Sequence, residues 1–231
     1  MVHPTRIGGV RRAVRSLVAP LLGMTVCIGL VVDASSADKH KTKTQWMLRP
    51  AQTADLAPLP EVAARQKCGN WAWAAAVEGV LRTAGLAISQ NELVMKASGG
   101  ELCGDESPSP QEMIHAIEGE LRLEDGRKFR LQTRYRPGAP TSPEDLIVSV
   151  MRRHPLVLFW RGRAYLLAGV TYDEYIAPTG ARRFEIRALR LADPLAPPEK
   201  KAAERLVTFV KGRDDPGEIE GVLEVVAAPV P

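Results

Sequence analysis

The chain has little of the material that several kinds of site require. Only three of its 231 residues are cysteine and four are histidine, and no metal-ligand spacing connects the two types, so neither a zinc site nor another cofactor is expected. Lys and Arg form no compact cluster with interleaved aromatic residues, which argues against a nucleic-acid partner. No internal repeat with a period of about 20 to 50 residues is visible, so a repeat architecture is not expected.

Residues 1–37 have the order of a secretory signal peptide. Four arginines precede the apolar run 17–32, and Ala34-Ser35-Ser36-Ala37 supplies small residues before a polar one. We expect cleavage after Ala37 and an exported protein, either periplasmic or secreted. The apolar run is short for a membrane span and is interrupted by Pro20, so an uncleaved leader that anchors the chain is the alternative.

The remainder of the chain is close to neutral. The formal net charge is +4, and residues 1–37 hold four arginines and one aspartate, so their removal leaves +1. The basic character lies largely in the leader, and it does not indicate an acidic partner for the mature protein.

Cysteine usage agrees with export. Cys27 lies in the leader and follows Val26 rather than a small residue, so a lipid attachment site has little support. Cys68 and Cys103 remain in the mature chain. Two cysteines in an oxidising compartment most simply form a disulfide, which would tie the start of a central helix to a glycine-rich loop.

Local patterns predict helices first and strands after them. From Trp71 onward, apolar residues recur at the spacing of a buried helix, with Asn70 as its N-cap and Gly85 as its end. Three more helix starts are marked by the pairs Ser89 with Glu92, Ser109 with Glu112, and Ser142 with Asp145. Strand patterns follow at 128–135, 155–160, 164–172, 183–191, 206–210 and 221–227. This order predicts an α+β domain with a mostly antiparallel sheet.

The start of the central helix carries an active-site pattern that lacks its nucleophile. Residues 66–75 read Gln-Lys-Cys-Gly-Asn-Trp-Ala-Trp-Ala-Ala. They resemble the motif Gln-x-x-x-Asn-Trp-Cys-Trp-Ala-Ala of a bacterial branch of the papain-like cysteine peptidases. In that family the Cys begins the central helix, where the positive end of the helix dipole favours its thiolate, and the Gln amide helps to form the oxyanion hole. Gln66 is retained here, but Ala72 stands at the Cys position, and a methyl group cannot attack a carbonyl.

The second part of the family's site is also altered. The base is a His in a Gly-His-Ala/Tyr frame, and this chain has Gly162-Arg163-Ala164-Tyr165. A guanidinium stays protonated, so Arg163 cannot accept a proton from a thiol. The Asp-Pro that orients the His has its counterpart in Asp193-Pro194. We therefore predict that Arg163 and Asp193 form an ion pair, and a separation above about 8 Å would contradict the alignment.

The resemblance covers approximately residues 60–195 and implies a papain-like fold with a cleft between two lobes. Residues 38–60 are expected to form an extended arm before the domain, with Trp46-Met47-Leu48 as its candidate docking residues. Residues 61–231 would form the papain-like domain. Its helical lobe is expected at about 61–125 and its sheet lobe at about 126–231.

The first functional interpretation is a catalytically degenerate peptidase homologue, not an active enzyme. Gln66, the backbone amide of Ala72 and Arg163 could converge on a carboxylate, which suggests a peptide or protein ligand in the cleft and an inhibitory or scaffolding role. No membrane contact is expected beyond an uncleaved leader.

Three alternatives remain open at this point. The protein could be an active cysteine hydrolase in which Cys68 or Cys103 is the nucleophile and His115 or His154 the base. It could be an inactivated variant of a cysteine peptidase. It could also be a structural or interaction domain whose resemblance to peptidases is limited to the fold. The grouping or scattering of Gln66, Ala72, Arg163 and Asp193 would distinguish the last alternative from the first interpretation.

Overall fold

The computed structural model describes residues 45–56, 63–100, 103, 107–123, 125–196 and 200–230, all within one structural unit. The predicted signal peptide, 1–37, lies outside these residues, as does the first part of the predicted arm. His40 lies outside them as well.

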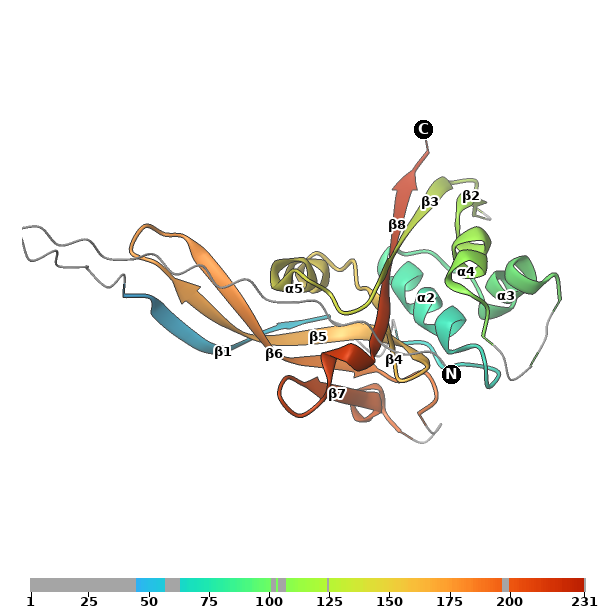
Figure 1. The fold of residues 1–231 in the computed structure, drawn as a ribbon. Helices are drawn as coiled ribbons and strands as arrows, with labels where there is room; N and C mark the ends of the chain where they lie inside the picture. Colours follow the sequence, from blue (N-terminus) through green and yellow to red (C-terminus); the bar gives the residue numbers. More distant parts are fainter. Residues whose placement is uncertain are drawn as a thin grey trace, which may run out of the picture. The chain divides into compact units, whose positions relative to one another are not determined.

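An antiparallel sheet of eight strands forms the centre of the fold (Figure 1). Seven strands follow one another across the sheet in the order β2 (Gly119–Arg122), β3 (Lys128–Pro137), β8 (Ile219–Pro229), β4 (Val157–Trp160), β5 (Arg163–Ile176), β6 (Arg182–Ala192) and β7 (Leu206–Val210). The eighth, β1 (Met47–Asp55), pairs with β5 beyond the end of β4. The last strand of the chain, β8, therefore lies in the middle of the sheet, between β3 and β4.

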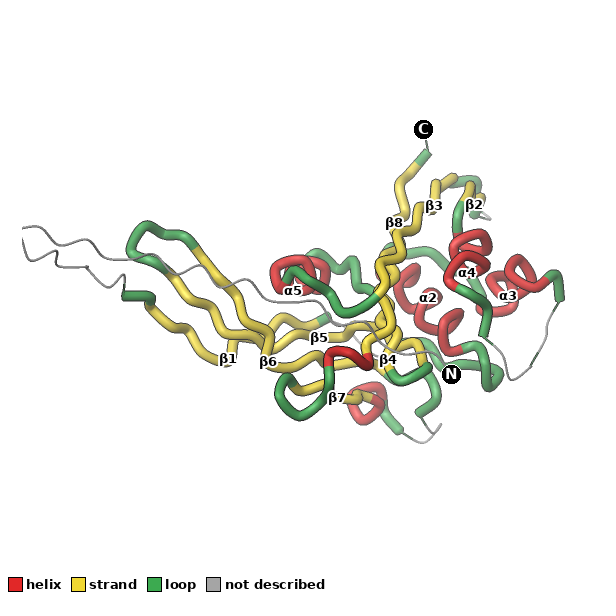
Figure 2. The backbone as a smooth tube through the Cα atoms, in the orientation of Figure 1, coloured by secondary structure: helices red, strands yellow, loops and turns green. Residues whose placement is uncertain are grey.

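The described part of the chain has four α-helices: α2 (Ala72–Thr83), α3 (Gln90–Ser98), α4 (Pro110–Ile117) and α5 (Pro143–Met151). Helices α2, α4 and α5 pack against the sheet, whereas α3 packs against α2 and α4. Helix α2 contacts β5, β4 and β8, whereas α5 contacts β5, β1 and β6. Figure 2 shows α2, α3 and α4 grouped together, with α5 apart from them. The predicted α+β class with an antiparallel sheet is confirmed.

Helix α2 buries the predicted apolar stripe except at its last position, Ala84, which is exposed and is the C-cap of the helix. Its side chains from Trp73 to Leu81 are buried except at position 78, and they pack into one core with the strands of the sheet. The predicted N-cap is wrong by one residue, because Trp71 occupies the cap position and makes no side-chain capping bond. Gly85 follows the end of the helix with φ +73°, a backbone conformation that favours glycine.

Serine caps start the other three helices as predicted. The hydroxyls of Ser89 and Ser109 accept from the backbone N–H three residues later, and the carboxylates of Glu92 and Glu112 bond back, so both capping boxes are complete. Ser142 accepts from the Asp145 N–H at 3.2 Å without the reciprocal bond.

Strand β1 arises within the segment predicted as an arm. Its backbone pairs with β5 from Met47 opposite Ile176 to Asp55 opposite Gly169, while all of its side chains but one are exposed. Trp46, Met47 and Leu48 remain 41%, 53% and 46% exposed. The backbone ladder, rather than those side chains, therefore holds β1 on the domain.

A buried carboxylate reinforces this contact. Asp173 on β5 is only 2% exposed and accepts from Arg187 Nε at 2.7 Å and from the Ala51 N–H of β1 at 3.0 Å. The hydrogen bond from Arg187, followed by the one from Ala51, holds the pKa of Asp173 below its usual value, although burial opposes the shift.

We expect the protein to lose stability in acid through this group. Because the folded-state pKa is below the unfolded-state value of about 4, the stabilisation is complete above pH 4 and is lost as the pH falls through the folded-state pKa. Urea unfolding between about pH 2.5 and 7 should show a flatter pH dependence in Asp173→Asn than in the wild type. Asp145→Asn, a change at an exposed carboxylate on α5, is the control. An identical pH profile in wild type and Asp173→Asn would contradict the assignment.

Two elements depart from a simple division into lobes. Strand β2 lies within the predicted helical lobe, 61–125, yet pairs with β3 in the sheet. Helix α5 lies within the predicted sheet lobe, 126–231. Each of the two predicted lobes, 61–125 and 126–231, therefore contains both helix and strand.

Candidate functional site

Three hydrogen bonds, one to Pro194 and two to Gln90, hold the segment before α2. The Gln66 N–H donates to the carbonyl of Pro194 at 3.0 Å, and the Lys67 N–H donates to Gln90 Oε1 at 3.0 Å. Gln90 is 2% exposed and returns a bond from Nε2 to the Arg65 carbonyl at 2.6 Å. These contacts fix the chain that leads into Ala72, the first residue of α2.

The predicted disulfide is confirmed. Cys68 and Cys103 are bonded, with their Cα atoms 5.3 Å apart and a sequence separation of 35. The bond ties the chain before α2 to the connection between α3 and α4. Neither sulfur is a free thiol in this arrangement, so neither can act as a nucleophile without prior reduction.

A tight hairpin places Arg163 beside the start of α2. The turn between β4 and β5 consists of Arg161 and Gly162, both with positive φ (52° and 70°), as the two-residue turns of twisted hairpins require. Glu220 on β8 accepts the Gly162 N–H at 2.5 Å and steadies the turn. Arg163 follows as the first residue of β5.

The predicted ion pair is confirmed. Arg163 Nη2 lies 3.0 Å from Asp193 Oδ1, and the two side chains are 35% and 17% exposed. Asp193 directly follows β6, and the same Oδ1 accepts the Leu195 N–H at 2.9 Å, which fixes the carboxylate in the turn. Because the Pro194 carbonyl accepts from the Gln66 N–H, the turn that carries Asp193 also holds the segment before α2.

Ala72 and Arg163 line a common pocket of about 180 Å³. Its polar lining includes Ser107, Tyr135 and Glu220, and its apolar lining includes Trp73, Met113 and Phe159. The Tyr135 and Phe159 rings meet edge to face, with centroids 5.9 Å apart. The pocket is therefore a small, partly aromatic hollow between the N-terminus of α2, the β4–β5 turn and β8.

Gln66 does not present its amide to this pocket. Its Nε2 donates to the carbonyl oxygens of Cys68 and Gly69, both at 2.9 Å, and Gln66 is not among the lining residues. Both amide hydrogens thus serve the loop before α2. Of the four expected site residues, Ala72 and Arg163 share the pocket, and Asp193 is joined to Arg163 by the ion pair without lining the pocket. Gln66 braces the loop instead of completing an oxyanion site.

The pocket holds no nucleophile and base of the peptidase kind. Neither Cys nor His is among the described residues that line it. Burial raises the pKa of Tyr135 and of Tyr165, which neighbours Arg163, so both phenols stay protonated at neutral pH. His154 lines a separate pocket, with Arg134, Arg136 and Arg152.

Sequence reasoning missed Tyr135, Phe159 and Glu220 as pocket residues. The one local signal was Gly221, where an added Cβ would clash with the ring and hydroxyl of Tyr135. A glycine inside a strand marks a close approach, but it does not say which residue approaches.

The described residues contain no group of three or more His, Cys, Asp or Glu that could hold a metal ion. Among the helices described here, none is long and apolar enough to cross a bilayer. The chain matches no protein-family model and no curated protein. The likeness to papain-like peptidases therefore rests on the three motifs and their placement.

Proposed function

We propose that this chain is an exported, catalytically degenerate relative of the papain-like cysteine peptidases that binds a peptide or protein segment without cleaving it. The observation that carries the proposal is the Arg163–Asp193 ion pair, whose arginine lines the same pocket as Ala72. It stands where that family has its His–Asp pair, beside a helix N-terminus where that family has its thiolate.

The groups in the pocket suit binding rather than chemistry. The Arg163 guanidinium has five N–H donors, and the bond to Asp193 uses one of them, so others can donate to a ligand carboxylate or carbonyl. Trp71 makes no side-chain cap on α2, and the first amides of the helix can donate to an anion. Trp73, Met113 and Phe159 would contact an apolar side chain. A peptide carboxyl terminus that ends in an apolar residue fits this set.

The exchange of two positions favours a naturally degenerate site over an inactivated variant of a working peptidase, since inactivation needs only the Cys to change. The shared pocket of Ala72 and Arg163 and the ion pair to Asp193 support the proposal over a resemblance limited to the fold, whereas the position of Gln66 outside the pocket does not. The alternative of an active cysteine hydrolase at Cys68 or Cys103 is opposed by the disulfide between them.

Restoring the two lost positions tests the proposal. We expect Ala72→Cys combined with Arg163→His to react with iodoacetamide at about pH 6 at least tenfold faster than Ala72→Cys alone, because the imidazole can accept the proton of the introduced thiol and the Arg163 guanidinium cannot. In Ala72→Cys with Arg163 retained, a tripeptide ending in a free-acid Phe should slow alkylation, and its C-terminal amide should not. Mass spectrometry of the alkylated peptide measures both.

Ala87→Cys, an exposed position outside the pocket, is the control thiol, and neither Arg163→His nor the tripeptide should alter its labelling. Equal rates in the single and double variants would show that the two positions do not form a peptidase-like pair. If neither peptide slowed alkylation, the proposed peptide binding would be wrong, but the proposed relation to the papain-like peptidases would still stand.

A further inference from the structure

Strand β6 has an open edge beyond the end of β7. Strand β7 pairs only with Ala188–Ala192 of β6. The β5–β6 ladder shifts register between Thr171 and Tyr172, which places the extra residue Arg187 in β6. Such a bulge bends a strand and ends regular pairing. From Arg182 to Ile186, β6 pairs with β5 alone, and no other strand in the described part of the chain covers its outer side.

The same sheet already joins two strands end to end on the opposite edge of β5. Strand β4 pairs with Arg163–Leu166, and β1 continues beyond it along Gly169–Ile176. The β1 side chains are mostly exposed, so the backbone ladder carries that contact. A strand placed in line with β7 would complete β6 in the same way.

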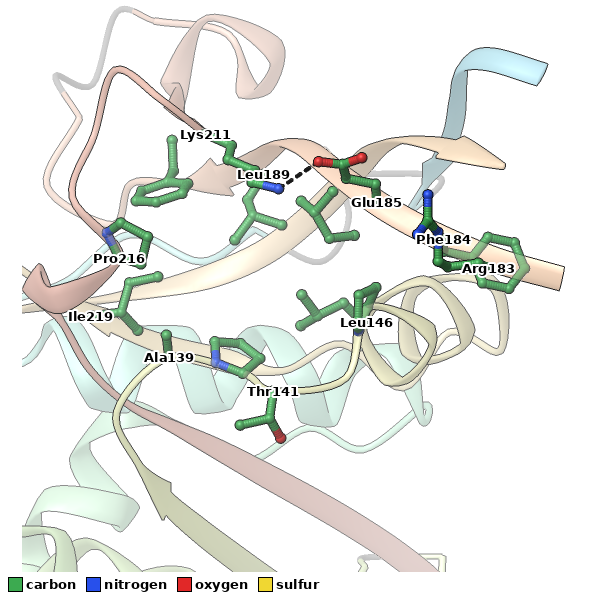
Figure 3. Close-up of a pocket in the computed structure, with 14 residues that line it drawn as sticks. Ala139, Thr141, Leu146, Arg183, Phe184, Glu185, Leu189, Lys211, Pro216 and Ile219 are labelled. Carbon is green, nitrogen blue, oxygen red and sulfur yellow. Dashed lines mark hydrogen bonds and ion pairs between the residues drawn. The ribbon is translucent and has the colours of Figure 1, made fainter. Parts of the chain in front are cut away.

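An apolar groove of about 430 Å³ lies between β6 and the segment that leads into α5 (Figure 3). Four consecutive residues, Arg183, Phe184, Glu185 and Ile186, line it. Since successive side chains of a strand point to opposite faces, the groove is not confined to the side chains of one face. Ala139 and Leu146 lie across the groove from these residues (Figure 3), and the lining also includes Pro140, Phe209, Lys211 and Pro216.

Two charged residues of β6 that line the groove, Glu185 and Arg183, differ in whether they form an ion pair. Glu185 accepts from Lys211 Nζ at 2.7 Å and from the Tyr175 hydroxyl at 3.3 Å, so both of its oxygens are engaged. The Arg183 guanidinium lies over the rings of Tyr175 and Trp46, 4.6 and 5.8 Å from their centroids, and makes no ion pair with any described carboxylate. Aromatic faces hold this cation in place and leave its N–H donors for a ligand.

Charged side chains along an edge strand commonly serve to prevent unwanted pairing, and that explains Arg182, Arg187 and Lys211. It does not explain the half-buried Phe184 and Ile186, which line a groove beside the same strand. Strand addition uses these two features together, because backbone bonds give affinity and a pocket for alternate side chains gives specificity.

We propose that an extended segment of another protein binds along Arg182–Ile186 as an added strand in line with β7, with an apolar side chain in the groove and an acidic one beside Arg183. This interaction surface shares no residue with the pocket at Ala72, so it is a second site.

A random twelve-residue peptide library displayed on phage is the probe. Binders are selected on the wild-type protein and depleted on Ala139→Trp, whose indole fills the groove from the wall opposite the strand. Selected peptides should pair an apolar residue with an acidic one. Their affinity should fall at least tenfold in Ala139→Trp and in Arg183→Glu, a change at an exposed side chain, and should be unchanged in Arg163→Gln. Thermal unfolding of each variant verifies that it is folded.

N-methylation of the selected peptide separates strand addition from side-chain docking. Methylation of alternate amides on one edge of the peptide should abolish binding, whereas methylation on the other edge should not, because an added strand bonds through one edge only. Hydrogen exchange at 182–186 should slow in the complex. No selected peptide, indifference to methylation on both edges, protection only around Ala72, or self-association of the protein through this edge would each overturn the proposal.

Discussion

Replacing Trp73 with alanine is expected to lower the free energy of unfolding by about 3 kcal/mol, near the lower end of the range for truncation of a buried Trp. Trp73 is 2% exposed and lies in the first turn of α2, within the core shared with the sheet. Because it also lines the pocket at Ala72, the space left by its ring would be continuous with that pocket and accessible to water. Water would relieve part of the cost of the cavity.

Urea unfolding followed by far-UV circular dichroism measures this change without relying on the fluorescence of the residue removed. Met151→Ala is the matched control, because Met151 ends α5 and is 66% exposed, and its loss should change stability by less than about 0.5 kcal/mol. A loss of under 1 kcal/mol in Trp73→Ala would place its side chain outside the core.

Loss of the disulfide is expected to cost a similar amount. On the chain-entropy account, a bridge across 35 residues stabilises by about 3 to 4 kcal/mol, because it restricts the unfolded chain. The double variant Cys68→Ser, Cys103→Ser, made in protein without residues 1–37, should therefore unfold at lower urea concentration than the wild type. Thiol titration in urea of the unreduced wild-type chain without residues 1–37, which also lacks Cys27, should find no free thiol.

Reductant provides the internal control, since it should destabilise the wild type to the level of the double variant and leave the double variant unchanged. A free thiol in the unreduced protein would contradict the bridge. It would also restore Cys68 and Cys103 as candidate nucleophiles and so revive the hydrolase alternative.

Local order was the part of the fold that could be predicted. The stripe of α2, the serine caps of α3 and α4 and the whole of β7 follow from neighbouring residues, because a helix cap or an apolar period needs no distant partner. Strands β1 and β2 were missed. Strand β1 has almost no buried side chain and β2 has four residues, so pairing with distant strands, not their own pattern, makes them strands.

The candidate site could also be predicted only in part. The frame around Arg163 and the turn at Asp193 could be aligned with a motif, and their ion pair followed from opposite charge at matched positions. The orientation of Gln66 could not be predicted, because its amide can donate either into a pocket or to the nearby carbonyls of Cys68 and Gly69. Only the folded loop brings those carbonyls within reach.

The sequence by itself determined the serine-capped helix starts and the pairing of Cys68 with Cys103, and it carries the residue types at positions 72 and 163 on which the proposed relationship depends. These properties are carried by residue type and short spacing. The tertiary structure alone decided that β8 lies between β3 and β4, which brings Glu220 to the turn before Arg163 and Tyr135 to the pocket wall. It also decided that β7 stops at a bulge and leaves the β6 edge open. Both outcomes depend on which strands pair across the sheet, and the backbone hydrogen bonds that pair them are much the same for every residue type.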